Sequence, residues 1–347
     1  MSRRPARNLR ASTRHPERMD AGGSSAETHC TIVTLDESPK QAGLVWVGTD
    51  DGKLWLTRDA GKSWTDLTRN LRGVPAGLYV SRVEASHHDA GTAYVAIDGH
   101  RSDVFRPFLL KTRDFGRTWT SIVANLPAHG PVKVVRESPG NPGLLFAGTE
   151  FGLFASLDGG ARWLPFGAGL PTVAVDDLLI HPRDRDLIVG THGRSVYIVD
   201  DVTPLERWTA AAAREPVTLF QPRPAHAFLY RPMSGNWGQR RFSADNPKFG
   251  AYLNYFVREW DGEKVSIEIV GPGGRTVRKL DGPGTPGFHR VVWDLSGEPR
   301  ERIDNPEWSD QPQFVPAGTY TVKLTYGKHP KQEQPLVVEV EPGTMDP

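Results

Sequence analysis

Three carboxylates stand where a pair could act across a cleft. Asp98 precedes a polar loop, Glu150 directly follows Gly148-Thr149, and Asp177 lies near the start of a later strand-like run. Hydrolysis of a glycosidic bond uses two carboxyl groups about 5 to 10 Å apart. A pair drawn from these residues is therefore the candidate catalytic set, and the alternative is that each is a solvated loop carboxylate.

The segment Gly190-Thr191-His192-Gly193-Arg194 could bind a carboxylate or sugar hydroxyl groups. Two glycines let a ligand approach the backbone closely, and an arginine donates two parallel hydrogen bonds. His192 and Arg194 are therefore candidate ligand contacts. Alternatively, Arg194 pairs with Asp200 or Asp201 and stabilises the end of the last repeat.

Aromatic and histidine side chains add further possibilities. Rings that could stack on a sugar, or could equally belong to the core, are Trp55, Tyr79, Phe151 and Tyr197. A metal could be suggested by His87, His88, His100, His181 and His192. No cysteine partner or metalloprotease-type spacing accompanies these histidines, so we expect no metal and no cofactor.

Three copies of a short turn motif must position such residues. Each copy has a hydroxyl residue followed by Asp, Gly and Trp at fixed spacing: Thr57, Asp59, Gly61 and Trp64; Thr112, Asp114, Gly116 and Trp119; Ser156, Asp158, Gly160 and Trp163. We expect the Asp to accept hydrogen bonds from the turn, the Gly to adopt a positive φ, and the Trp to pack back as an apolar group. The motif is therefore predicted to be structural.

The turns recur at the spacing of propeller blades. Asp59 and Asp114 are 55 residues apart, and Asp114 and Asp158 are 44 apart. Repeats of this length built from short strands indicate a β-propeller. We predict four blades within 29–202, the second carrying an insertion at 100–107.

The motif resembles the Asp box, or BNR repeat, of bacterial sortilin-like and "glycosyl hydrolase" β-propeller proteins. Because such proteins close with about seven blades per ring, the resemblance implies that this chain is the C-terminal part of a larger exported protein. Self-association or upstream blades would then complete the ring. Sialidases of this kind add a Phe-Arg-Ile-Pro segment, which Phe105-Arg106-Pro107 matches only loosely.

The remainder of the chain has a different pattern. A short helix is predicted at Thr203-Pro204, followed by a Pro- and Gly-rich linker to residue 250. From 251 to 342, period-two strands predict a β-sandwich, which resembles the immunoglobulin-like module of the flagellar hook-capping protein. Residues 343–347 form a tail. The predicted fold class is all-β, with a partial propeller of about four blades followed by a small immunoglobulin-like sandwich.

Composition restricts the function classes. The 347 residues carry a net charge of +1 with scattered basic side chains, which does not favour a nucleic-acid partner. No apolar run is long enough for a membrane span, and the single cysteine, Cys30, excludes an internal disulfide. Residues 1–28 are expected to be a disordered Arg-rich leader without a signal peptide, so localisation stays open although the resemblance implies export.

These observations favour a non-catalytic propeller module that binds a polysaccharide or a protein partner. One alternative is a xyloglucanase-like glycoside hydrolase fragment that uses paired carboxylates. Another is a non-functional gene fragment.

Overall fold

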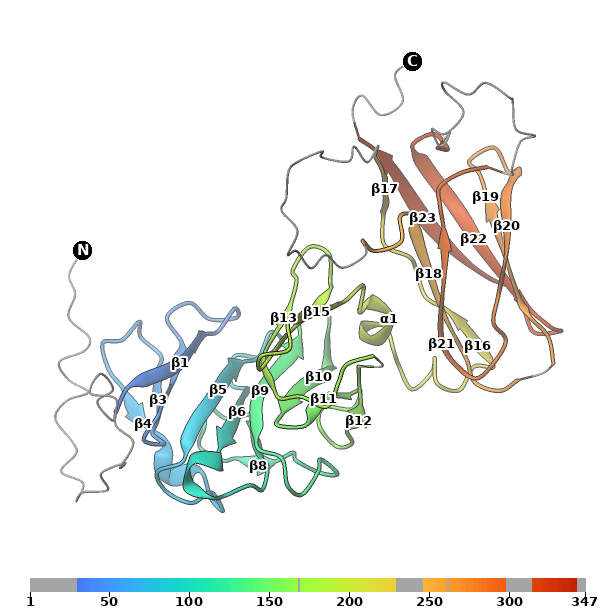
Figure 1. Ribbon diagram of the computed structural model, residues 1–347. Helices are drawn as coiled ribbons and strands as arrows, with labels where there is room; N and C mark the ends of the chain where they lie inside the picture. Colours follow the sequence, from blue (N-terminus) through green and yellow to red (C-terminus); the bar gives the residue numbers. More distant parts are fainter. Residues whose placement is uncertain (1–29, 168, 229–245, 261, 298–313, 342–347) are drawn as a thin grey trace, which may run out of the picture. The chain divides into compact units, whose positions relative to one another are not determined.

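The computed structural model describes residues 30–167, 169–228, 246–260, 262–297 and 314–341. Nearly all of its regular structure is β-strand, which confirms the all-β class (Figure 1). The chain divides into two compact units, Met1–Glu206 and Arg207–Pro347, called here the propeller unit and the sandwich unit. The predicted leader at 1–28 and the predicted tail at 343–347 lie outside the described residues.

The propeller unit contains four consecutive antiparallel sheets, called blades 1 to 4, each with its strands in chain order. Blade 1 consists of β1 (Ile32–Glu37), β2 (Val45–Thr49), β3 (Leu54–Thr57) and β4 (Thr65–Asp66). Blade 2 consists of β5 (Tyr79–Ala85), β6 (Ala93–Asp98), β7 (Phe108–Thr112) and β8 (Thr120–Ser121). Blade 3 consists of β9 (Val132–Ser138), β10 (Asn141–Thr149), β11 (Gly152–Ser156) and β12 (Leu164–Pro165), and blade 4 of β13 (Val175–Ile180), β14 (Leu187–Thr191) and β15 (Val196–Val199).

Neighbouring blades pack through their apolar faces. The first strand of each blade contacts the first strand of the next, so β1, β5, β9 and β13 form the inner row (Figure 1). Buried clusters fill each space between blades, with Trp46 between blades 1 and 2, Leu109 between blades 2 and 3, and Phe146 between blades 3 and 4. Successive side chains of a strand point to opposite faces of the sheet. A blade that lies between two others can therefore bury apolar side chains on both of its faces. The result is a partial β-propeller of four blades.

In each of blades 1 to 3, the repeated turn connects the third strand to the fourth strand. In blade 1, the Asp59 carboxylate accepts hydrogen bonds from the Thr57 hydroxyl at 2.9 Å, the Ser63 N–H at 2.9 Å and the Ser63 hydroxyl at 2.6 Å. Asp114 accepts the same three bonds in blade 2, from Thr112 and Thr118. In blade 3, Asp158 accepts from the Ser156 hydroxyl and the Arg162 N–H.

These bonds explain the acidity of the turn carboxylates. The bonds from the Ser63 hydroxyl and N–H lower the pKa of Asp59 to about 2, and the equivalent bonds from Thr118 lower the pKa of Asp114. The turn glycines Gly61, Gly116 and Gly160 adopt φ values of 85°, 76° and 95°. Of the three turn tryptophans, Trp163 is buried, whereas Trp64 and Trp119 are half-buried.

The sandwich unit consists of two sheets that share one core. One sheet has the order β16 (Val217–Leu219), β18 (Ala251–Val257) and β21 (Gly287–Trp293). The other has the order β17 (Ala225–Ala227), β23 (Gln332–Val340), β22 (Gly318–Tyr326), β19 (Val265–Val270) and β20 (Thr276–Gly282). Leu253 and Trp293 from the first sheet join Ile267 and Val322 from the second in the buried cluster.

The segment 203–250 differs from the predicted helix and linker. The helix is present as α1 (Thr203–Glu206), but β16 and β17 within the expected linker are strands of the two sandwich sheets. Each has three residues and pairs with a strand that is far along the chain, Val217 with Val257 and Ala225 with Val338. Such short strands carry too little period-two pattern to be recognised from the sequence.

Candidate functional site

Each inner strand of the propeller unit carries an irregularity at the same place near its start. The register of β1, β5, β9 and β13 against the second strand of its blade shifts by one residue there. The residues at the shift are Val33, Ser81, Lys133 and Asp176. A β-bulge re-aims the extra side chain relative to its neighbours. In two of the four blades the residue at the bulge, Lys133 or Asp176, is therefore a charged one.

A second row of residues lies beside these bulges, where the second strand of each blade ends. The equivalent residues are Asp50, Asp98, Glu150 and His192. The N–H groups of Asp50, Glu150 and His192 donate to the carbonyl groups of Thr31, Pro131 and Ala174, which places each residue next to the start of its inner strand. Polar side chains of several blades therefore gather at one end of the inner row.

Lys133 lies at the centre of this gathering. Its Nζ is 3.1 Å from Glu150 Oε2, 3.6 Å from Asp98 Oδ2 and 3.7 Å from Asp176 Oδ1. Each aspartate also meets a histidine: His100 Nδ1 is 2.7 Å from Asp98 Oδ2, and His192 Nδ1 is 2.9 Å from Asp176 Oδ2. We call these six residues the Lys133 network.

The charges of the Lys133 network hold the lysine in its ionised form. Burial by itself would lower the pKa of Lys133, but the hydrogen bond to Glu150 and the charges of Asp98, Glu150 and Asp176 outweigh it, and the pKa is raised. An amine nucleophile needs the opposite shift. Lys133 is therefore suited to holding carboxylates in place and not to covalent catalysis.

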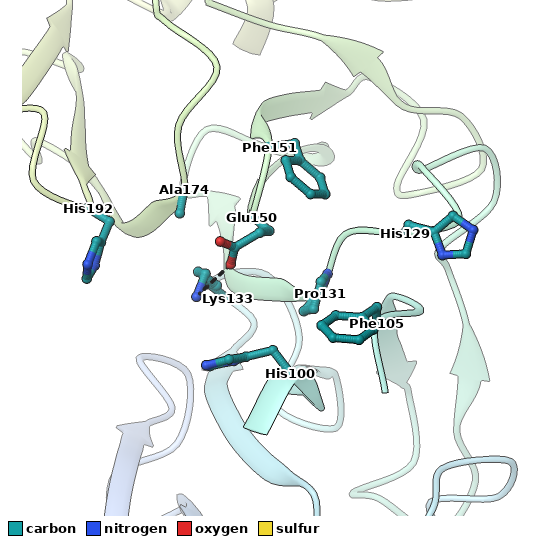
Figure 2. A pocket seen from close by; sticks show the side chains of 9 residues that line it. All are labelled: His100, Phe105, His129, Pro131, Lys133, Glu150, Phe151, Ala174 and His192. Carbon is teal, nitrogen blue, oxygen red and sulfur yellow. Dashed lines mark ion pairs between the residues drawn. The ribbon is translucent and has the colours of Figure 1, made fainter. Parts of the chain in front are cut away.

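The Lys133 network borders a cleft of about 620 Å³ within the propeller unit. Figure 2 shows Lys133 reaching the Glu150 carboxylate, with the Phe151 ring beside Glu150 and the rings of Phe105 and His129 beyond Pro131. One side of the cleft is therefore charged and the other is largely aromatic. A cleft of this volume is within the range of small-ligand sites, about 300 to 1,000 Å³.

The aromatic side is held together by the loop at Gly130. The Gly130 N–H donates to the Phe105 carbonyl at 2.9 Å, and a Cβ at Gly130 would lie 3.3 Å from the Phe151 ring. Phe105 belongs to the insertion of blade 2, which forms the 3-10 helix His100–Ser102 and turns back so that the Val104 N–H donates to the Gly99 carbonyl. Phe105 and Phe151 are nevertheless 50% and 53% exposed, so both rings are available to a ligand.

Of the three predicted carboxylates, the structure brings together Asp98 and Glu150 through Lys133 but not Asp177. The Asp177 carboxylate lies 2.5 Å from Arg82 and 3.3 Å from Arg136, farther along the inner row. Arg136 also bonds to the buried Glu84 at 2.5 Å. Burial raises the pKa of Glu84 to about 7, against the lowering effect of the Arg136 charge. Asp176, one residue earlier, reaches the Lys133 network instead. The bulge at Asp176 directs its side chain away from that of Asp177.

The predicted ligand contacts are not gathered in one place. His192 lines the cleft, whereas Arg194 is exposed and does not line it. The alternative pairing of Arg194 with Asp200 or Asp201 stays a prediction, and Asp201 accepts a hydrogen bond from the Thr203 hydroxyl at 2.6 Å. Of the other three predicted rings, none lines the cleft. Trp55 is half-buried on β3, Tyr79 is half-buried at the start of β5, and Tyr197 on β15 packs against the core between blades 3 and 4.

Sequence reasoning missed Lys133, Asp176 as a contact distinct from Asp177, and Phe105 as a second ring of the cleft beside Phe151. The available signal for Lys133 is its place between apolar residues in Pro131-Val132-Lys133-Val134-Val135, at the start of β9. Phe105 was considered only as part of a sialidase-like segment. In the structure, Arg106 of that segment lies over the Phe108 ring at 4.7 Å and does not line the cleft.

Among the residues that the structure describes, no group of three or more metal-ligating side chains could hold a metal ion. Nor does the described part of the chain contain a helix that is long and apolar enough to span a membrane.

No protein-family model matches the chain, and no curated protein matches its sequence. Solved structures that resemble it include YCF48 bound to the D1 peptide, with 14% identity, 73% of this chain and 69% of that chain covered, and a TM-score of 0.37.

Two GH74 enzymes are also similar. The xyloglucanase of Xanthomonas campestris has 17% identity, covers 88% of this chain and 44% of its own, and gives a TM-score of 0.41. The enzyme of Niastella koreensis has 17% identity, 78% and 38% coverage, and a TM-score of 0.40. The chain thus spans less than half the length of either enzyme. At these TM-scores the likenesses carry no argument, and the fold rests on the strand pairing of the chain itself.

Proposed function

We propose that the propeller unit is a non-catalytic binding module whose cleft takes a segment of a polysaccharide. The observation that carries this proposal is the pairing of two exposed rings, Phe105 and Phe151, with the Lys133 network across one cleft. A sugar ring has an apolar face that stacks on aromatic side chains and hydroxyl groups at its edge that bond to carboxylates and imidazoles. A protein segment with an aromatic or basic side chain is the second candidate ligand.

The arrangement of the carboxylates argues against catalysis. A glycosidase needs one carboxyl group that keeps its proton until the leaving group takes it. Asp98, Glu150 and Asp176 instead all lie within 3.7 Å of the Lys133 ammonium group, so ion pairing with one lysine accounts for all three carboxylates, of which Glu150 lines the cleft. The alternative of a glycoside hydrolase rests on Asp98 and Glu150, which both pair with Lys133 and of which Glu150 lines the cleft.

Three broader assignments, which concern the turns, the sandwich unit and the protein as a whole, form part of this proposal. The Asp-box assignment of the turns is supported by the sequence motif and by the hydrogen bonds of Asp59, Asp114 and Asp158. The immunoglobulin-like class of the sandwich unit and membership of a larger exported protein are supported by the sequence motifs alone.

The test is a binding panel of soluble plant and bacterial polysaccharides measured by calorimetry, with the release of reducing ends followed in parallel. We expect binding without release, and about tenfold weaker binding for Phe151→Ala, which corresponds to about 1.4 kcal/mol. Leu164→Ala, which shortens an exposed apolar side chain on β12, is the matched control and should bind normally. Release of reducing ends that Glu150→Gln abolishes would establish the hydrolase instead, and binding of peptides alone would favour the protein ligand.

A further inference from the structure

The Lys133 network carries more negative charge than positive charge. One ammonium group, that of Lys133, faces the three carboxylates of Asp98, Glu150 and Asp176. Two negative charges are therefore unbalanced whenever the two histidines of the network are neutral. A surface with an excess of one charge attracts ligands of the opposite charge and repels ligands of its own. The charged side of the cleft is therefore suited to a cationic ligand.

The exposure of these side chains strengthens the preference for a cation. The side chains of Lys133 and Asp98 are only 17% and 7% exposed, whereas those of Glu150 and Asp176 are 39% and 43% exposed. Glu150 lines the cleft. Among the described residues, its carboxylate pairs with Lys133 through Oε2 and has no second ion-pair partner. The negative groups are therefore more accessible to a ligand than the positive group.

The two exposed phenylalanine rings of the cleft are available to a cation of the ligand. Elsewhere in the propeller unit, cationic side chains of the chain itself lie over aromatic rings: Arg58 over Phe115, Arg101 over Tyr79, Arg106 over Phe108 and Lys111 over Tyr94. In the part of the chain that the structure describes, no such cation lies over Phe105 or Phe151. An ammonium group within about 6 Å of a ring centroid, over the ring face, is attracted to the ring.

Glu150 and Phe151 offer both attractions at one point of the cleft. They are consecutive residues between β10 and β11, both line the cleft, and Figure 2 shows the Phe151 ring beside Glu150. A cationic group bound here gains an ion pair with the carboxylate and the attraction of the ring, whereas a neutral hydroxyl group gains only a hydrogen bond. The carboxylate also favours the protonated form of an amine that binds beside it.

We propose that the polysaccharide bound in this cleft carries free amino groups, as a polymer of glucosamine does. This inference rests on the proposed function and names the class of polysaccharide. The sugar rings stack on Phe105 and Phe151, and an amino group donates to the Glu150 carboxylate. A fully acetylated polymer has no amine to donate, and a uronic acid polymer brings carboxylates to a cleft that already has an excess of them. Both are expected to bind more weakly.

The test is calorimetry of the full chain with two oligosaccharides of the same length and linkage, a glucosamine oligomer and its fully N-acetylated form. The glucosamine oligomer should bind about fivefold more tightly, which is the value of one partly exposed ion pair, and added salt should reduce this difference. Glu150→Gln keeps the shape but removes the charge, so it should abolish most of the difference and leave binding of the acetylated oligomer unchanged. Glu37→Gln, an exposed residue on β1 whose amide can still accept from the Gly43 N–H, is the matched control and should change neither affinity.

A second variant, Asp176→Asn, should also reduce the difference, and a native circular dichroism spectrum of each variant checks that it folds. Equal affinity for the two oligosaccharides, or tighter binding of the acetylated one, would overturn the amino-sugar assignment and leave the proposed binding function standing. A difference that persists in both variants would overturn the inference by placing the cation away from these carboxylates. Binding of lysine-containing peptides without binding of any polysaccharide would overturn the proposed function together with this inference.

Discussion

Replacing Gly116 by alanine is expected to destabilise the propeller unit much more than replacing Gly61, although both are the glycine of the same turn. Gly116 and Gly61 both have positive φ, 76° and 85°. A Cβ at Gly116 would lie 2.4 Å from Leu67 Cδ1 and 3.2 Å from the Trp46 ring, whereas a Cβ at Gly61 would meet nothing closer than 3.8 Å. Leu67 and Trp46 belong to the buried cluster between blades 1 and 2, so neither can move away freely.

The magnitude follows from two separate costs. A residue with a Cβ in the left-handed region costs about 1 to 2 kcal/mol, and this cost applies to both variants. Overpacking a filled core costs about 1 to 3 kcal/mol, and this cost applies to Gly116→Ala alone. The expected loss is therefore about 1 to 2 kcal/mol for Gly61→Ala and roughly 2 to 5 kcal/mol for Gly116→Ala.

The assay is equilibrium unfolding in urea, with the tryptophan fluorescence of the native chain and the two variants recorded under the same conditions. The difference between the variants measures the contact with Leu67, because the backbone cost is common to both. Equal losses would refute the steric argument. Gly116→Ala combined with Leu67→Ala should lose less stability than the sum of the two single variants, because the shortened side chain leaves room for the new Cβ.

Three further outcomes are expected. Asp59→Asn should be less stable than the native chain at pH 5, and the difference in stability should shrink as the pH falls towards 2. The lowered pKa of Asp59 contributes stability to the native chain above the unfolded value of 3.8, and this contribution is lost as the carboxylate protonates. A difference in urea midpoints that stays constant with pH would contradict this. Glu84 has a folded pKa raised to about 7 from 4.5, so its contribution falls as pH rises from 4.5 through 7, and the stability of Glu84→Gln relative to the native chain should increase over that window; no change in the relative stability would contradict it. Lys133→Met should lower the free energy of unfolding by about 1 to 3 kcal/mol, and with it the melting temperature, because it leaves the buried Asp98 without its ammonium partner. Lys62→Met, in an exposed turn, should leave the melting temperature unchanged.

The turns and the blade count could be predicted because the interactions that form them are local. Asp59 bonds to residues two and four positions away, so residue type and spacing along the chain determine that geometry. The three turns, 55 and 44 residues apart, mark three of the four blades, whereas blade 4 has no such turn. The strands 217–219 and 225–227 were not predicted because each depends on partners more than 35 residues away in the chain.

The site depended on tertiary structure. The sequence determined that Asp98 and Glu150 follow the second strands of neighbouring blades, and it gave Phe151 as an available ring. Only the packed blades decided that Asp176 and not Asp177 reaches Lys133, since the bulge at the start of β13 assigns neighbouring residues to different directions. Charges from three blades meet at Lys133 because their inner strands lie side by side, and contacts between residues so far apart in the chain leave no spacing pattern in the sequence.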